Sequence, residues 1–229
     1  MKPRDERRAR TLLALLFTVG LWTVPSVLAQ HGHGQDRMPS VMEYLERLER
    51  PERDHDQKPA QVVDALSLKP GMSVADLGAG SGYFTRRFLE AVTETGKVFA
   101  IDVEPEALKH IERSLVQLHR PYKAEFILAK PDNPNIPVAS VDLVFLCNTY
   151  HHLEDRAAYF RNLRPSLKPG GRIAIVDFHH DERSGDLGFS KRHLVPRDKV
   201  VDEMTAAGYR LTNEHTFLPR QYFLEFQPT

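Results

Sequence analysis

From residue 58 onward, apolar runs of strand length alternate with segments whose apolar residues recur at helical spacing. The apolar runs predict strands at about 72–77, 97–102, 123–128, 141–147 and 171–178. The intervening segments predict helices at about 59–66, 82–94, 105–118 and 155–166. Alternation of this kind is typical of an α/β domain in which helices cover both faces of a parallel sheet.

The end of the chain has a different pattern. Two strand-like runs, at about 209–217 and 221–227, are joined only by Leu218-Pro219-Arg220. So short a connection favours an antiparallel hairpin. We therefore expect a Rossmann-like, doubly wound α/β fold with a mostly parallel seven-stranded sheet, an antiparallel C-terminal strand and helices on both faces.

The first 29 residues have the composition of an export signal. A basic start is followed by an apolar stretch, Thr11 to Trp22, and by Val27-Leu28-Ala29, which resembles a cleavage site. An uncleaved anchor helix is the alternative, although the apolar stretch is short for a membrane span. Either case leaves the rest of the chain outside the inner membrane. We expect a periplasmic protein, cleaved near Ala29, that contacts the membrane only if the segment is uncleaved.

Residues 30–57 are expected to form a polar tail and one short helix ahead of the main domain, residues 58–229. Val41, Tyr44, Leu45 and Leu48 recur at helical spacing in this segment. The pattern predicts an amphipathic helix that lies across the domain and covers a ligand cleft.

Charge and cysteine content narrow the possible functions. Without residues 1–29 the chain has 26 Lys and Arg against 29 Asp and Glu, so no basic surplus attracts nucleic acid. The single cysteine, Cys147, has no intrachain partner for a disulfide and is expected to pack in the core. The sequence does not indicate an oligomeric state.

A glycine-rich loop follows the first predicted strand of the domain. In "VADLGAGSGYF", residues 74–84, Gly78, Gly80 and Gly82 stand at every second position after Asp76. The loop lies at the carboxyl edge of the sheet, where ligands of such folds bind, and glycine lets a ligand approach the backbone. The spacing differs from the G-x-G-x-x-G of dinucleotide folds, and the carboxylate of Asp76 favours a cationic group over a phosphate.

Three further segments complete a recognisable pattern: "VFAIDVEPEAL", "AKPDNPNIPVASVDLVFLCNTYHHL" and "LRPSLKPGGRIAIVDF". With the glycine loop they extend over about residues 58–228 and resemble the class I S-adenosylmethionine-dependent methyltransferases. The resemblance implies S-adenosyl-L-methionine as cofactor and methyl transfer as the reaction. "NTYHHLEDR" lacks the two prolines of relatives that methylate nucleic-acid bases or glutamine, so it resembles relatives that methylate small molecules.

The resemblance also assigns cofactor contacts. It implies that Asp102 holds the ribose hydroxyls, that Asp132 reaches the adenine amine, and that Asp76 meets the amino group of the methionine part or orients the loop amides. The expected cofactor residues are Asp76, Gly78, Ala79, Gly80, Gly82, Tyr83, Asp102, Val103, Asp132, Asn133 and Asn148. Asp102 as a surface acid at a strand end, and Asp132 as an ordinary turn residue, remain the alternatives.

The candidate catalytic residues, His151 and Tyr150, follow the fourth strand. Methyl transfer from a sulfonium is an in-line displacement, and a base is needed only if the acceptor must lose a proton. His151 is the candidate base, and Tyr150 is expected beside it in the acceptor space. The alternative is that His151 or His152 caps the helix that begins near Glu154.

The segment after the fifth strand, "FHHDERSGDLGFSKRHLVPRDKVVDEM", is where this fold places acceptor-binding residues. His179, His180, Asp181 and His193 are residue types that bind metals. Successive strand residues point to opposite faces, which argues against His179 and His180 sharing an ion, so no metal is expected. His193 is the more plausible acceptor contact.

Two other functions stay open because an export signal places the protein where S-adenosylmethionine is not expected to be plentiful. The fold could serve as an exported, non-catalytic binding module for a nucleoside or other small molecule. An NAD-dependent oxidoreductase is the third possibility.

Overall fold

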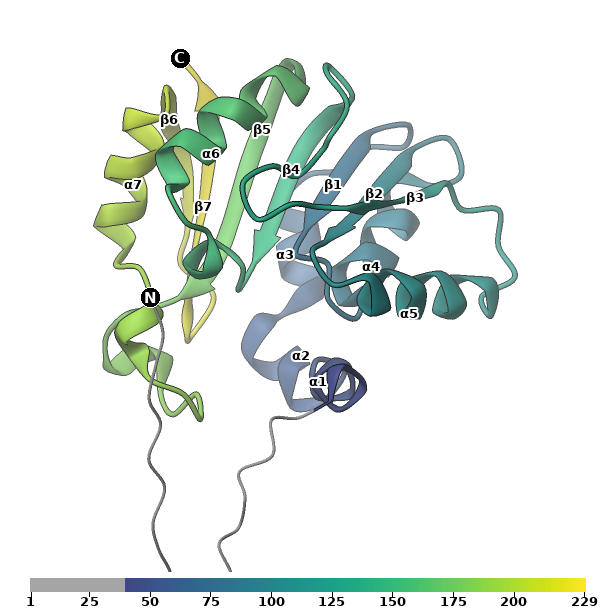
Figure 1. Ribbon diagram of the computed structural model, residues 1–229, viewed down its shortest axis with the longest axis horizontal. Helices are drawn as coiled ribbons and strands as arrows, with labels where there is room; N and C mark the ends of the chain where they lie inside the picture. Colours follow the sequence, from purple (N-terminus) through teal and green to yellow (C-terminus); the bar gives the residue numbers. More distant parts are fainter. Residues whose placement is uncertain (1–39) are drawn as a thin grey trace, which may run out of the picture. The chain divides into compact units, whose positions relative to one another are not determined.

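The computed structural model describes residues 40–229, so the predicted export signal and most of the polar tail lie outside the described residues. The chain builds one seven-stranded sheet of order β3-β2-β1-β4-β5-β7-β6 (Figure 1). The strands are β1 (Ser73–Leu77), β2 (Lys97–Asp102), β3 (Ala124–Leu128), β4 (Val141–Cys147), β5 (Leu167–Phe178), β6 (Tyr209–His215) and β7 (Gln221–Pro228). Neighbours from β3 to β5 pair in parallel, and β7 is antiparallel to both β5 and β6. The predicted fold class is confirmed.

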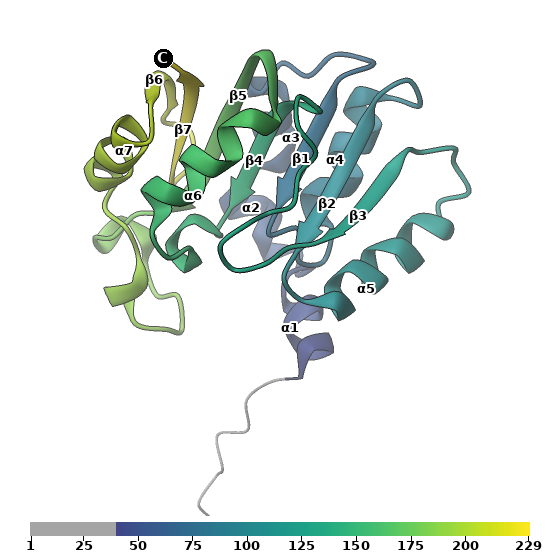
Figure 2. The same cartoon turned by 45° about the horizontal axis from the view of Figure 1, so that its top comes forward.

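Helices cover both faces of this sheet (Figure 1 and Figure 2). They are α1 (Val41–Arg47), α2 (Glu52–Gln57), α3 (Pro59–Ala65), α4 (Tyr83–Val92), α5 (Pro105–Val116), α6 (Arg156–Leu163) and α7 (Arg197–Ala206). The central strand β4 shows why its sequence is almost continuously apolar. Leu143 and Phe145 pack toward α3 and α4, whereas Val144 and Leu146 pack toward α6 and α7. A strand buried on both faces carries no polar alternation.

The observed elements differ from the expected ones where turn residues or polar helices conceal the pattern. Strand β5 begins at Leu167 and includes the Lys-Pro-Gly-Gly segment, with a register irregularity opposite Val141 and Leu143. Helix α6 ends at Leu163, and a 3-10 turn that contains Pro165, Arg164–Ser166, follows it. Helix α2 was not expected, because its sequence, ERDHDQ, has no apolar face.

The strand ends bring four loops to one edge of the sheet. Leu77 of β1 pairs with Ile101 of β2 and with Leu146 of β4, and Cys147 pairs with Val176 of β5. The loops after β1, β2, β4 and β5 therefore start side by side. The predicted amphipathic helix is α1, which begins with a capping box at Ser40. None of the described helices is long and apolar enough to cross a membrane.

Candidate active site

A cavity of about 610 Å³ opens at the carboxyl edge of β1, β2 and β4. Its walls come from α1, α2, the glycine loop, the end of β2, the segment after β3 and the loop after β4. Lining residues discussed below are Tyr44, Leu48, Arg53, Gly78, Ala79, Gly80, Asp102, Val103, Lys130, Pro131, Cys147, Asn148, Thr149 and His152. A space of this size, walled mostly by apolar residues with a few charged groups, is typical of a small-molecule site.

The glycine loop is squeezed between neighbouring segments. The backbone N–H groups of Gly78 and Ala79 donate to the Ile101 carbonyl, at 2.8 and 3.0 Å. Gly78 has φ +77°, and a Cβ there would lie 2.2 Å from Thr149 Oγ1. Gly80 has φ +55°, and its Cβ would lie 2.8 Å from a methyl group of Leu48. Close packing therefore requires glycine at position 78, whereas at position 80 the left-handed backbone is the main reason, because the end of the Leu48 side chain could move.

Asp102 faces the cavity as a fixed carboxylate at the end of β2. Its Oδ2 accepts from Gly80 N at 2.8 Å and its Oδ1 accepts from Glu104 N at 3.0 Å. A carboxylate has about four acceptor positions, so each oxygen keeps capacity for a ligand donor. Asp102 is partly buried in the cavity wall, with Val103 beside it. Asp102 is therefore not a freely solvated surface acid.

Asp76, Gly82 and Tyr83 do not line the cavity. Asp76 is buried, and its Oδ2 accepts from Thr85 Oγ1 at 2.6 Å. Burial raises the pKa of Asp76 to about 6, against the opposing effects of the Thr85 hydrogen bond and the charge of Arg53. Gly82 packs on Ile111 of α5. Three of the expected cofactor residues therefore lie outside the cavity wall.

Asp132 and Asn133 lie on an exposed turn after β3. Lys130 and Asn133 exchange two backbone hydrogen bonds, at 2.8 and 3.1 Å. The cavity is lined instead by their neighbours Lys130 and Pro131. The structure therefore brings this segment to the cavity without bringing the predicted carboxylate to its wall.

Asn148 lines the cavity directly after β4, in a left-handed backbone conformation with φ +55°. Its Oδ1 accepts from Gln221 Nε2 of β7 at 2.6 Å. The preceding Cys147 lies partly in the core and partly in the cavity wall. Burial raises the pKa of its thiol to about 12, so the sulfur is not a thiolate at neutral pH.

Tyr150 is fully buried and does not line the cavity. Its hydroxyl donates to Glu203 Oε2 of α7 at 2.7 Å, and its ring stacks on Phe160 with centroids 5.6 Å apart. The expected place of Tyr150 in the acceptor space is therefore corrected: it joins α6 and α7 in the core. The capping alternative for the histidines is wrong, because Asp155 is the N-cap of α6.

His151 and His152 form a 3-10 turn with Tyr150, and they point to different surroundings. The His151 side chain is 3% exposed, with Nδ1 2.8 and 3.0 Å from the two carboxylate oxygens of Asp177. His152, not His151, lines the cavity. Asp177, at the end of β5, was missed by the sequence reasoning, although an acid in the apolar run "IAIVDF" was an available signal.

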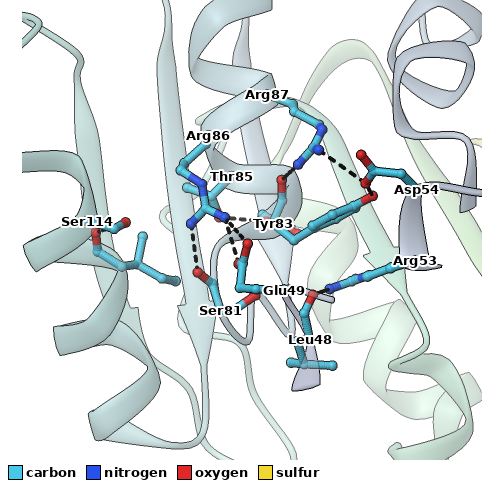
Figure 3. A network of polar contacts seen from close by, with 12 residues as sticks. Leu48, Glu49, Arg53, Asp54, Ser81, Tyr83, Thr85, Arg86, Arg87 and Ser114 are labelled. Carbon is cyan, nitrogen blue, oxygen red and sulfur yellow. Dashed lines mark hydrogen bonds and ion pairs between the residues drawn. The ribbon is translucent and has the colours of Figure 1, made fainter. Parts of the chain in front are cut away.

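Arg53 of α2 is a second lining residue that the sequence reasoning missed. Its guanidinium lies 3.9 Å from the centroid of the Tyr83 ring. Its Nε donates to Gln57 Oε1 at 2.6 Å. Its Nη1 donates to the Leu48 carbonyl at 2.7 Å (Figure 3). No pattern could have identified it, because Arg53 reaches the cavity only through the position of α2.

Residues 41–57, which we call the lid, are fastened to α4 by charged contacts. Arg86 Nη2 donates to both carboxylate oxygens of Glu49, at 2.6 and 2.7 Å (Figure 3). The Tyr83 hydroxyl donates to Asp54, which also lies 3.5 Å from Arg87 Nη2. The lid thus holds Tyr44 and Arg53 at the cavity through contacts with the helix that follows the glycine loop.

The candidate metal residues are not gathered into one site. The His179 ring packs on Tyr222, and Asp181 pairs with Arg183 at 2.7 Å. Across residues 40–229, no three His, Cys, Asp or Glu side chains are grouped so that they could hold a metal ion.

Sequence comparisons point to methyltransferases. Residues 75–173 match a family model described as a methyltransferase domain. The ubiquinone/menaquinone biosynthesis C-methyltransferase UbiE of Escherichia coli O1:K1 / APEC is 28% identical over 155 residues, which are 66% of this chain and 62% of that protein. UbiE of Salmonella arizonae is 25% identical over the same length. The chain thus spans less than two thirds of the length of these relatives.

Solved structures share the fold. An S-adenosylmethionine-dependent methyltransferase from Aquifex aeolicus has a TM-score of 0.76 at 24% identity, covering 84% of this chain and 100% of that one. The [4+2]-cyclase SpnF has a TM-score of 0.60 at 16% identity, covering 70% of this chain and 58% of that one. Together the comparisons show similarity to methyltransferases in sequence and a shared fold with the solved structures. The cyclase illustrates that this fold alone does not fix the reaction.

Proposed function

We propose that this protein is an S-adenosylmethionine-dependent methyltransferase that acts on a small molecule. The observation that carries the proposal is the pairing of Asp102 with the glycine loop at one cavity wall. The Asp102 carboxylate is held by two backbone N–H groups and still has acceptor capacity toward the cavity. Vicinal hydroxyl groups of a ribose are suitable donors for such a carboxylate.

The residues of the cavity fit the other parts of this cofactor. Any side chain at Gly78 or Gly80 would collide with Thr149 or Leu48, so the loop backbone itself forms the wall that a ligand meets. Arg53 would pair with the carboxylate of the methionine part, since guanidinium groups bind carboxylates well. Lys130 and Pro131 would border the adenine. When bound, the cofactor supplies an electrophilic methyl group on a sulfonium.

The character of the cavity wall supports an apolar acceptor. Val41, Leu45, Leu48 and Leu153 supply apolar surface beside the polar groups named above. The UbiE relatives are named as C-methyltransferases of ubiquinone and menaquinone biosynthesis. We infer an acceptor with an apolar ring system, which the protein's task is to align with the methyl group while the lid excludes water.

Binding calorimetry and turnover test the proposal in sequence. S-adenosylhomocysteine should bind the protein, and NAD should give neither heat nor a thermal shift. Radiolabelled S-adenosylmethionine with a panel of phenols, thiols and carboxylates should then yield a methylated product. NAD binding without S-adenosylhomocysteine binding would instead favour the oxidoreductase. A cofactor-saturated protein that methylates nothing in the panel would favour the binding module.

The location of the protein is a separate part of the proposal. The basic and apolar pattern of residues 1–29 supports export to the periplasm. N-terminal sequencing of the protein from a periplasmic fraction should then begin at Gln30. A chain that keeps Met1 and sediments with membranes would support the anchor, and one that keeps Met1 in the cytoplasm would contradict export.

A further inference from the structure

Two imidazoles, those of His151 and His152, and the carboxylate of Asp177 lie together beside the part of the cavity that the loop after β4 forms. The His151 and His152 ring centroids are 4.0 Å apart, at an interplanar angle of 44°. The Asp177 carboxylate contacts the His151 ring, and His193, from the loop after β5, acts electrostatically on His152. The ring of Phe189, in the same loop, stacks near the His151 ring, with the two ring centroids 6.4 Å apart.

His151 is held in place and turned away from the cavity. Asp177 is 1% exposed and accepts from both the ring Nδ1 and the backbone N–H of His151, the latter at 3.1 Å. Asp177 also accepts from the Phe178 backbone N–H at 2.8 Å. A buried carboxylate needs such partners, and these contacts fix both the backbone and the ring of His151. His151 itself does not line the cavity.

His152 has the position that His151 lacks. It lines the cavity together with Asn148 and Thr149, and its ring packs on the fixed ring of His151. The rigid pair Asp177–His151 therefore supports His152 from behind, in the way that a general base is oriented by a third group.

We propose that His152 is the catalytic base of the methyl transfer proposed above and that Asp177 and His151 are its positioning residues. The acceptor is then a phenol, because a phenol combines the apolar ring that suits the cavity wall with a proton that a base must remove. The phenolic oxygen, or the ring carbon that it activates, forms a bond to the methyl carbon. The bond between the methyl carbon and the sulfonium sulfur breaks, and its electron pair stays on sulfur. The proton leaving the acceptor moves to the free imidazole nitrogen of His152, so one positive charge passes from sulfonium to imidazolium.

The surroundings of His152 keep it ready to accept a proton. Burial lowers the pKa of His152, the electrostatic effects of the neighbouring His151 and His193 lower it further, and Asp177 opposes them. His152 is therefore neutral at pH 7, which a base requires. The titratable groups that act on its pKa are His151 of the 3-10 turn after β4, Asp177 of β5 and His193 of the loop after β5.

Two matched acceptors test the role of His152. At about pH 7, 1-naphthol carries its proton, whereas 4-nitro-1-naphthol is ionised and needs no base. His152→Gln should lower the methylation rate of 1-naphthol by about 100-fold to 10,000-fold, the usual effect of losing a general base, and that of 4-nitro-1-naphthol by less than about 10-fold. Equal losses for the two acceptors would overturn the assignment, as would a larger loss with His151→Gln than with His152→Gln.

The positioning pair has its own readout. Asp177→Asn removes a negative charge near His152, so the acid limb of the rate–pH profile for 1-naphthol should move to lower pH. A lower rate with an unmoved limb would indicate only a structural role for Asp177 and would overturn its part of the proposal.

The inference rests on the proposed function, and calorimetry with S-adenosylhomocysteine separates the two. If the wild type binds this ligand but methylates neither naphthol, the phenolic acceptor and the base are refuted while the cofactor site stands. If the wild type does not bind it, the proposed function itself fails. Unchanged affinity in His152→Gln shows that the variant is folded.

Discussion

Gly78→Ala should destabilise the protein more than an ordinary glycine substitution, because two costs coincide at this position. The backbone has φ +77°, a conformation that costs an alanine roughly 1–2 kcal/mol. The new Cβ would also lie 2.2, 2.5 and 2.9 Å from three side-chain atoms of Thr149. Thr149 cannot simply rotate away, since its hydroxyl donates to the Cys147 carbonyl at 3.2 Å. Overpacking of this kind costs about 1–3 kcal/mol, so the sum is about 2–5 kcal/mol.

The chain offers a matched control for the backbone cost alone. Gly170 has φ +79°, and nothing lies within 4 Å of the position of its Cβ. Gly170→Ala should therefore cost only about 1–2 kcal/mol. Thr149→Gly removes all three atoms that the new Cβ of Gly78→Ala would meet, so combining the two substitutions should recover the overpacking part and leave the backbone part. A double-mutant cycle then measures the clash directly.

Urea unfolding followed by far-UV circular dichroism is the suitable assay, because the only tryptophan, Trp22, lies in the predicted export signal. The free energies of unfolding should rank wild type above Gly170→Ala, and Gly170→Ala above Gly78→Ala. The reasoning is refuted if the two alanine variants are equally stable, or if Thr149→Gly and Gly78→Ala act additively.

Three other predictions concern charged groups at or below the cavity. Asp102→Ala should weaken S-adenosylhomocysteine binding by about 1.5–3 kcal/mol in calorimetry, the scale of charge-assisted hydrogen bonds. Asp132→Ala, on the exposed turn, should change this binding free energy by less than about 0.5 kcal/mol, and similar losses in the two variants would contradict the placement of Asp102 alone at the cavity wall. Arg53→Met should weaken binding of S-adenosylhomocysteine but not of 5′-methylthioadenosine, which lacks the amino-acid part, and equal weakening would mean that Arg53 only shapes the lid. Burial raises the folded-state pKa of Asp76 to about 6 from 3.8, so the folded state binds the proton more tightly and the free energy of unfolding should fall as pH rises from about 4 to above 6, by on the order of 3 kcal/mol. Asp76→Asn should abolish that part of the slope in urea titrations at several pH values, and parallel curves for the two proteins would show that Asp76 is not its source.

The strands were predictable where burial on both faces leaves an uninterrupted apolar run, as in β2 and β4, whose observed bounds equal the predicted ones. The start of β5 was not, because Lys168 to Gly171 have the composition of a turn and form an irregularity between Leu167 and Arg172, which pair with β4. Helix α2 was invisible for a related reason. Its contacts with the domain are made by Arg53 and Gln57, whose side chains give no apolar period.

The site was predictable to the extent that it is local in sequence. The glycine loop and the acid at the end of β2 form a short-range motif, and the structure brings Gly80 and Asp102 into a hydrogen bond. The partnership of His151 with Asp177 joins two strand ends and has no sequence spacing to identify it. Nor could the sequence distinguish His151 from His152, since the 3-10 turn decides which of two adjacent rings faces the cavity.

Strand β7 has a consequence for the order of events during synthesis. Its residues 221–228 follow both β5 and β6 in the chain, yet they lie between these two strands, and Phe223, Leu224 and Phe226 are completely buried there. Until they leave the ribosome, β5 keeps an open edge and β6 has no strand to pair with. Open strand edges invite pairing with other chains. The sheet of a nascent chain therefore cannot close before β7 is made, so chains that stop before β7 are the forms in which this protein is most exposed to aggregation.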